Sequence, residues 1–299
     1  MTHFKNILVA LDLTKMDKQL IKASEIMARQ FRASSIRFVH VIPSFVLPDG
    51  VDMALKDIFS PSYQIDLSIE KEIREEIKAN FDKNIKLDKH IEVKEGPTAT
   101  LLEQASNISY ADLVIVGRKK ISGHSGITAK SLARKVKGAV LFVPENSGLG
   151  FNHILVPVDF SIYSQKALSL ALAFQKSNPS TTITAVHVID YPPNALYLTG
   201  QYGLLAPGWK KKVIGVMQHF IQQAGLKKEN IQVDSIKNDN FNISAQIAEH
   251  AKKIGADAII MGARGHSGLD DIFLGSVTEK LVALEEDLPV LIVRIEGNL

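Results

Sequence analysis

The sequence predicts an α/β fold of two tandem domains, each an open five-stranded parallel sheet with helices on both faces. Three observations lead to this prediction. The length of 299 residues is ordinary for two domains. The same short motifs occur twice, in the same order. Within each half, short apolar runs alternate with longer segments of helical periodicity, which is the pattern of βαβ units.

The repeated motifs indicate a duplication. Residues 4–12 contain the first predicted strand and the Asp at its end, and this run recurs 147 residues further on. The four motifs, each given as first copy and second copy, are residues 4–12 and 151–159, 39–42 and 186–189, 111–117 and 256–262, and 139–143 and 289–293. The short polar segment 145–150, which contains two glycines, joins the copies. We therefore expect domains at 1–147 and 148–299.

The repeated runs are short, β-branched and apolar on both faces, which is typical of parallel strands covered by helices. Between them, apolar residues recur on one face of a predicted helix. These residues are Leu20, Ala23, Met27, Phe31, Leu101, Ala105 and Ile108 in the first half, and Ala167, Leu170, Phe174, Ile243, Ile247, Ala251, Ile254, Val277, Leu281 and Leu284 in the second. Right-handed crossovers between the strands give a doubly wound sheet, which binds ligands at the carboxyl ends of its strands.

Two segments between the second strand and the next helix are long. Residues 66–81 have the pattern of a charged amphipathic helix, whereas residues 191–209 are rich in Pro, Gly and aromatic side chains. The second segment could be a lid, a partner surface or an ordered loop against the sister domain. The sequence leaves these alternatives open.

A glycine-rich loop follows the fourth strand of the second half. Residues 262–268 contain three glycines, and nine residues separate Gly265 from Gly275 and Ser276 at the start of the last helix. Glycines let backbone amides approach an anion, and a helix N-terminus adds unpaired N–H groups and a positive dipole end. The pattern predicts a phosphate cradle. The alternative is an ordinary βα loop with a serine helix cap.

The spacing G-x2-G-x9-G-S resembles the ATP-binding motif of the universal stress protein family. The resemblance extends over nearly the whole chain, because Asp159-Phe160-Ser161, the His-Val-Ile of the second strand, the Ala-Asp before the fourth strand and the terminal Pro-Val-Leu-Ile-Val also match. It implies two Rossmann-like domains of the adenine nucleotide alpha hydrolase type, in the tandem form of the family.

The resemblance implies that ATP or ADP binds in the second domain. Asp159 would approach the adenosine, and the backbone of Val188 would bond the adenine edge. The remaining implied ligand-binding residues, which hold the ribose and phosphates, are Gly262, Arg264, Gly265, His266, Gly275, Ser276, Val277 and Thr278. Mg²⁺ could accompany the phosphates, with water as most of its ligands. For Asp159 an Asx turn at the strand end is an equally good reading.

The first half departs from this motif. Lys120 occupies the position of the second glycine, and Lys130 with Ser131 replaces the closing Gly-Ser. A side chain at these positions blocks close approach of the backbone to a phosphate. We predict that the first domain does not bind ATP in the manner of the family.

Several function classes are disfavoured. The absence of cysteine excludes a thiol nucleophile and Cys-ligated metal, and the net charge of +3 comes from cations spread along the chain, which does not favour a nucleic-acid binder. No P-loop, dinucleotide fingerprint or nucleophile elbow occurs, and no apolar run is long enough to span a membrane. We therefore expect a cytoplasmic protein without catalytic residues.

The favoured function is a nucleotide-dependent stress sensor or regulator. Two alternatives stay open: a slow ATPase or autophosphorylating phosphotransferase, and a scaffold that binds a non-nucleotide ligand through the first domain. In the family the terminal strands pair across a dimer axis. This implies a pseudo-dimer of the two halves, and a further homodimer stays open.

Overall fold

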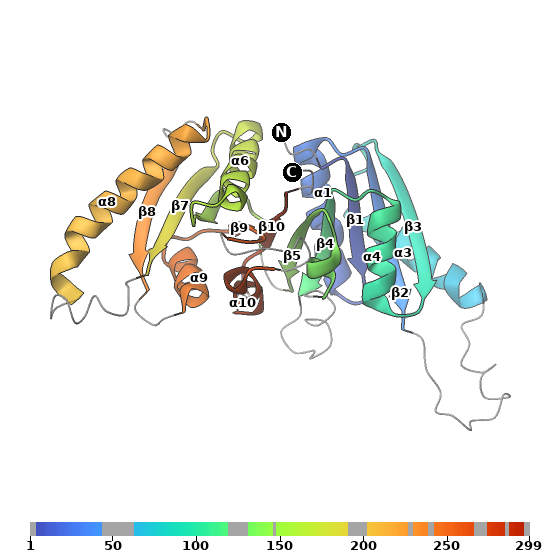
Figure 1. Cartoon of the computed structure of the whole chain (residues 1–299). Helices are drawn as coiled ribbons and strands as arrows, with labels where there is room; N and C mark the ends of the chain where they lie inside the picture. Colours follow the sequence, from blue (N-terminus) through green and yellow to red (C-terminus); the bar gives the residue numbers. More distant parts are fainter. Residues whose placement is uncertain are drawn as a thin grey trace, which may run out of the picture. The chain divides into compact units, whose positions relative to one another are not determined.

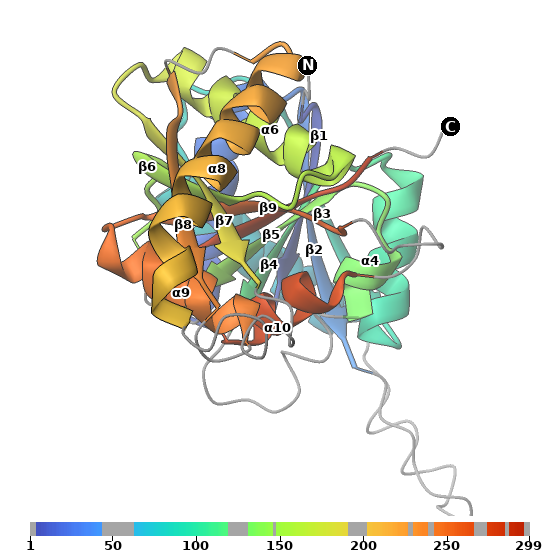
Figure 2. The same ribbon diagram turned by 60° about the vertical axis from the view of Figure 1, so that its left-hand side comes forward.

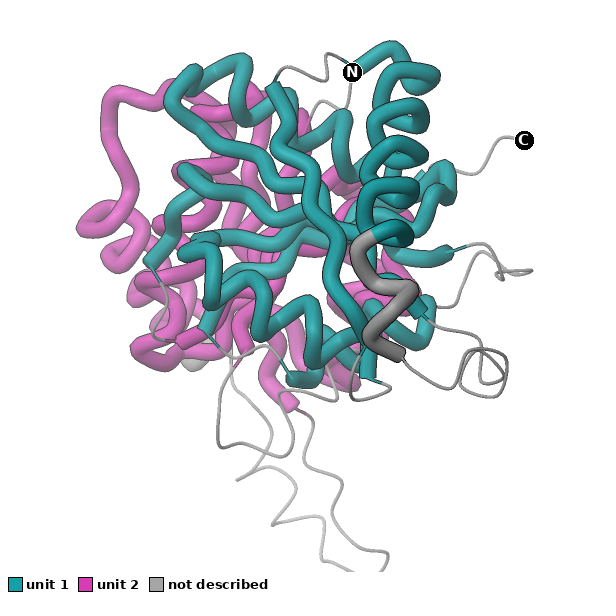
Figure 3. The backbone as a smooth tube through the Cα atoms, turned by 90° about the vertical axis from the view of Figure 1, so that its left-hand side faces the viewer, with its two compact units in different colours: residues 1–2, 146–299 teal, residues 3–145 magenta. Residues whose placement is uncertain are grey.

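The computed structural model describes residues 4–43, 63–118, 131–145, 148–190, 202–226, 230–238, 242–265, 274–284 and 287–295. The chain divides into two compact units (Figure 3). Residues 3–145 form one, called here the N-terminal unit, and residues 146–299 with residues 1–2 form the other, the C-terminal unit.

The N-terminal unit is a five-stranded parallel sheet with strand order β3-β2-β1-β4-β5. Helices α1 and α3 contact each other on one face of the sheet, and α4 contacts β1 and β2 on the opposite face (Figure 1). The elements are β1 (Asn6–Leu11), α1 (Met16–Phe31), β2 (Ser35–Ile42), α3 (Tyr63–Asn80), β3 (Asp88–Glu95), α4 (Thr98–Ile108), β4 (Leu113–Arg118) and β5 (Ala139–Pro144).

The C-terminal unit repeats this topology, with all-parallel strands in the order β8-β7-β6-β9-β10. Helices α6 and α8 lie on the face of the sheet opposite to α9 and α10 (Figures 1 and 2). The elements are β6 (His153–Pro157), α6 (Ile162–Ser177), β7 (Thr182–Ile189), α8 (Tyr202–Gln223), β8 (Gln232–Lys237), α9 (Ile243–Lys253), β9 (Ala258–Gly262), α10 (Ser276–Leu284) and β10 (Val290–Val293). The predicted fold class is confirmed.

The core lies around the central strands of each sheet. Every residue of β9, β10 and β5 is buried, as expected for strands covered by helices on both faces. By contrast β3 and β8, each at one end of its unit's strand order, carry exposed polar residues at both ends. The strand order reverses between β6 and β9 in the C-terminal unit, so a ligand is expected at the carboxyl ends of these two strands.

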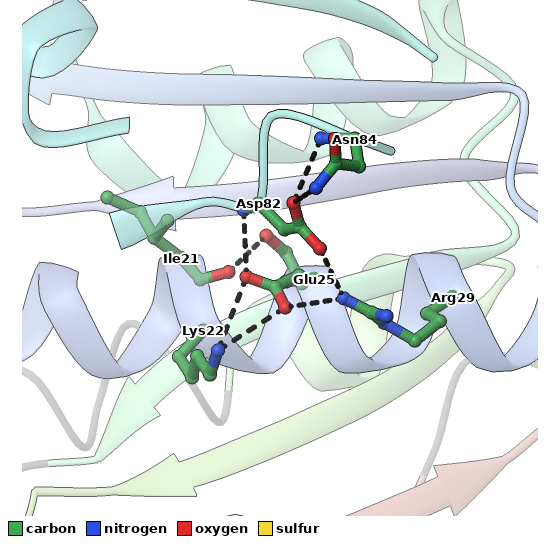
Figure 4. Close-up of polar contacts among 7 residues, drawn as sticks. Ile21, Lys22, Glu25, Arg29, Asp82 and Asn84 are labelled. Carbon is green, nitrogen blue, oxygen red and sulfur yellow. Dashed lines mark hydrogen bonds and ion pairs between the residues drawn. The ribbon is translucent and has the colours of Figure 1, made fainter. Parts of the chain in front are cut away.

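A polar network fixes α1 to the turn that follows α3 (Figure 4). The buried carboxylate of Glu25 accepts hydrogen bonds from Lys22 Nζ at 3.3 Å, Arg29 Nη2 at 3.2 Å and the backbone N–H of Asp82 at 3.0 Å. The Asp82 carboxylate in turn accepts from the Asn84 backbone N–H and from Arg29 Nη2, and these bonds lower its pKa. Both carboxylates are therefore held within this network.

The amphipathic segment 66–81 is helical, since α3 covers Tyr63–Asn80. Of the segment 191–209, residues 191–201 lie outside the described residues, and the remainder forms the start of α8. The choice between lid, partner surface and packed loop thus stays open for residues 191–201.

Candidate functional site

The C-terminal unit contains a cavity of about 430 Å³ at the carboxyl ends of β6, β7 and β9. This volume lies within the usual range for small-molecule sites. Strand ends form one side, α9 contributes an apolar wall, and the N-terminus of α10 closes the site. The lining residues are Pro157, Val158, Asp159, Ser164, Val186, His187, Val188, Asp190, Ile243, Ile247, Met261, Gly262, Arg264, Gly265, Gly275, Ser276, Val277 and Thr278.

The structure brings nine of the ten residues that the sequence singled out to this one cavity. They come from three strand ends and one helix start, which are far apart in the sequence. The nine are Asp159, Val188, Gly262, Arg264, Gly265, Gly275, Ser276, Val277 and Thr278. The tenth, His266, lies outside the described residues, as does the rest of the loop up to residue 273.

The N-terminus of α10 faces this cavity. The first hydrogen bond of the helix runs from the N–H of Glu279 to the carbonyl of Gly275, at 2.9 Å. The amides of Ser276, Val277 and Thr278 precede that bond, and such amides with the helix dipole form an anion site. The N–H of Gly275 donates to Ala263 O at 2.8 Å, which holds the helix start beside the end of β9.

The buried hydroxyl of Thr278 has a structural bond. It donates to the carbonyl oxygen of Gly262 at 2.9 Å and so ties α10 to the end of β9. Its hydrogen is therefore not available to a phosphate, and the backbone amide of Thr278 is its remaining donor towards an anion.

Asp159 forms the Asx turn that was the alternative reading of this residue. Its Oδ1 accepts from the N–H of Ser161 at 3.0 Å and from Ser161 Oγ at 2.5 Å. Ser161 then caps α6 by accepting from the N–H of Ser164. Because Asp159 also lines the cavity, the turn orients its carboxylate rather than removing it from the site.

Two glycines at and just after the end of β9 have neighbours close to the place of a Cβ, and only at Gly262 do these neighbours include backbone. A Cβ on Gly262 would lie 2.6 Å from Tyr163 Cβ, and one on Gly265 would overlap Oδ2 of Asp159. Both distances are shorter than real Cβ contacts. Glycine at these positions therefore lets the end of β9 approach α6 and the Asp159 carboxylate, apart from any ligand.

The cavity also has apolar walls that the motif did not predict. Ile243 and Ile247 of α9, Val186 of β7 and Met261 of β9 line it. Asp190 at the end of β7 adds a second carboxylate, whose Oδ1 accepts from Asn238 Nδ2 at 3.1 Å. Asp190 was not among the site residues predicted from the sequence, although it directly follows the repeated His-Val-Ile motif.

Arg264 adds positive charge to the lining. The residue is 7% exposed, and its guanidinium carbon lies 5.9 Å from the centre of the Tyr163 ring, within the range of a cation–π contact. Tyr163 belongs to α6, so the same helix that packs on Gly262 also positions Arg264.

The histidine that closes the second strand has the same role in both units. His187 Nδ1 lies 2.6 Å from the Val158 carbonyl oxygen, and His40 Nδ1 lies 3.1 Å from that of Leu11. The imidazole joins two neighbouring strand ends. The repeated histidine therefore has a structural role in both units.

The corresponding region of the N-terminal unit differs in charge. Asp17 occupies the place of Ser164 and accepts hydrogen bonds from the N–H groups of Asp12 and Leu13 at 3.0 and 2.9 Å. Burial, together with the nearby Asp12 carboxylate, raises the pKa of Asp17 to about 7. Lys120 and Lys130, on which the sequence argument relied, lie outside the described residues.

Comparison with known proteins settles the family. Residues 3–144 and residues 150–294 each match the model of the universal stress protein family. The chain belongs to this family. Universal stress proteins are stress-response proteins, and the match to both halves makes this one a tandem member.

Curated relatives match one half of the chain at a time. Universal stress protein YxiE of Bacillus subtilis is 30% identical over 161 residues, which cover 48% of this chain and 99% of that protein. Stress response protein NhaX of the same organism is 29% identical over 166 residues, 48% of this chain and 98% of that protein. These relatives thus correspond to a single unit.

Solved structures match the whole fold. A universal stress protein from Archaeoglobus fulgidus is similar with a TM-score of 0.69 at 18% identity, over 99% of both chains.

Among the described helices, none has the length and apolar character needed to cross a membrane. Within the same residues, no three His, Cys, Asp or Glu side chains are grouped to hold a metal ion.

Proposed function

We propose that the C-terminal unit binds ATP or ADP in its cavity, and that the protein acts as a nucleotide-dependent regulator of the stress response. The observation that carries this proposal is that the α10 N-terminus, with its unpaired amides, lines the same cavity as the apolar side chains of α9, β7 and β9. An adenine nucleotide has two matching parts, an apolar aromatic base and anionic phosphates.

In this proposal the phosphates lie against the amides of Ser276, Val277 and Thr278, with Arg264 adding charge. The adenine lies between β7 and the apolar face of α9, where the backbone of Val188 can bond its edge. Asp159 accepts from the ribose or the base. Any Mg²⁺ is bound mainly through phosphates and water, since Mg²⁺ retains several waters when few carboxylates are present.

The variant Ser276→Asp tests the phosphate end. An acidic side chain in the first turn stabilises a helix by interaction with its dipole, by about 0.3–1 kcal/mol. The same charge repels phosphates at the cradle. We therefore expect Ser276→Asp to leave the free energy of unfolding unchanged or raised and to weaken ATP binding by at least about tenfold, measured by calorimetric titration of the full chain.

Ser131→Asp, at the equivalent position of the N-terminal unit, is the matched control, and its ATP affinity should equal that of the wild type. Equal ATP affinity in wild type and Ser276→Asp would show that the nucleotide does not use the α10 cradle.

A further inference from the structure

The N-terminal unit has a second cavity, of about 380 Å³, between the C-terminal half of α3 and β3. Figure 1 shows this helix beside this strand at the end of the sheet. Four cationic side chains surround the cavity: Arg74, Lys78, Lys83 and Lys89. We call it the basic cavity. It belongs to a different unit from the proposed nucleotide site.

The floor of the basic cavity is apolar. It consists of Ile77 and Phe81, which are 7% and 5% exposed, and the half-buried Ile91. Lys89 Nζ lies 4.3 Å above the centre of the Phe81 ring. The cavity thus combines a small apolar floor, of which Ile91 is the most exposed part, with cations at its rim.

The nearby carboxylates are engaged elsewhere. Asp82, which separates Phe81 from Lys83, is bonded to Arg29 and Asn84 (Figure 4). Glu70 pairs with Arg74.

On β3, Glu92 pairs with Arg37 and Lys94. Among the described residues, the ammonium groups of Lys78, Lys83 and Lys89 form no ion pair with a carboxylate.

The C-terminal unit lacks three of these four cations at the corresponding positions, whereas the α3–α8 offset places Lys227 at the position of Lys83. Ile73 and Ile77 of α3 correspond to the buried pair Met217 and Ile221 of α8. The strand registers give Ile231 the position in the C-terminal unit that Lys89 has in the N-terminal unit. By this alignment Gln218 replaces Arg74 and Gln222 replaces Lys78. Since the two units share one fold, these three cations are not a requirement of the fold.

We propose that the basic cavity binds a small amphipathic anion, an apolar ring or chain with one carboxylate or phosphate head group. The apolar part covers Ile77, Phe81 and Ile91, which removes their remaining surface from water. The head group pairs with Lys78, Lys83 and Lys89. This site goes beyond the nucleotide site and does not depend on it.

The test uses the full-length protein with ¹³C-labelled isoleucine methyl groups, observed by NMR. Octanoate and octyl phosphate are the probes, and octanol is the uncharged control. We expect saturable shifts of the Ile77 and Ile91 methyl signals with an anionic probe, and none with octanol. Ile221 and Ile231 in the other unit serve as internal controls and should not shift. The head group that binds more tightly identifies the class of ligand.

Charge removal gives a second readout. Lys78→Gln combined with Lys89→Gln should weaken binding of the anionic probe about three- to tenfold, the effect of two exposed ion pairs. The matched control, Lys211→Gln with Lys212→Gln on the exposed surface of α8, should bind like the wild type. Absence of saturable shifts at Ile77 and Ile91, equal shifts with octanol, or unchanged affinity in the cavity variant would each overturn the proposal.

Discussion

Asp159 combines two functions that look like alternatives in the sequence. Its Oδ1 organises the turn before α6, while its Oδ2 faces the space that a Cβ of Gly265 would occupy. A carboxylate fixed by a turn is preorganised, so it requires little ordering when a ligand arrives. Gly265 therefore leaves room for the Asp159 carboxylate, in addition to any role towards a phosphate.

A variant of Gly265 tests how closely this residue packs against the Asp159 carboxylate. Gly265→Ala forces a Cβ against the Asp159 carboxylate, and overpacking of this kind typically costs about 1–3 kcal/mol of stability. The control is Gly215→Ala in α8, where a Cβ meets no atom within 4 Å. A helix interior favours Ala over Gly by about 0.5–1 kcal/mol, so the control should be stabilised. Urea denaturation of both variants measures the difference; equal stabilities would refute the packing argument.

Asp17 predicts a pH dependence with a defined sign. Its pKa in the folded chain, about 7, lies above the ordinary value of 3.8, because burial disfavours the charged carboxylate. The folded state therefore binds this proton more tightly. Its stabilising contribution is complete below about pH 4 and is lost as the pH rises through about 7.

The variant Asp17→Ser introduces the residue found at the equivalent position of the C-terminal unit. It loses two backbone hydrogen bonds at every pH, but only the wild type should also lose stability as the pH is raised from about 5 to about 8. The measurement is the free energy of unfolding at several pH values. Parallel curves for the two proteins would contradict the raised pKa of Asp17.

At the scale of elements, the repeated apolar motifs predict four strands of each unit, and periodicity predicts most of the helices. The strands buried on both faces form short apolar runs, and α3 and α9 have clear apolar faces. Strands β3 and β8 were not located from the sequence, because their polar, partly exposed residues give no apolar run. Local sequence does not encode which face of α9 meets a ligand. Ile243 and Ile247 were assigned to the helix core from spacing alone, and only the tertiary arrangement places them in the cavity wall.

The start of α10 shows the same limit of sequence reasoning. The sequence predicts an anion site at the helix start and includes Thr278 among the implied phosphate-binding residues, without separating its hydroxyl from its amide. That hydroxyl bonds Gly262, sixteen residues earlier in the chain, because the end of β9 and the start of α10 meet in the folded unit. Asp17 was missed for a similar reason, since its burial and its bonds depend on the turn around it.

At the scale of the molecule, duplication has produced two units with one topology and different chemistry. The C-terminal unit has a cavity with a glycine-lined helix start, whereas the N-terminal unit has Asp17 in place of Ser164 and a separate basic cavity. The buried carboxyl of Asp17 at the start of α1, where the C-terminal unit has the neutral Ser164, is one chemical difference between the two units. The departure of the first motif from the G-x2-G-x9-G-S spacing is another.

The central claim is that one unit of the two binds an adenine nucleotide. The most direct test is the stoichiometry of ATP binding to the full chain, measured by isothermal titration after bound nucleotide has been removed and identified by mass spectrometry. Our account predicts one ATP per chain. Two per chain would contradict the asymmetry between the units, and no binding, with no nucleotide released, would contradict the proposed function.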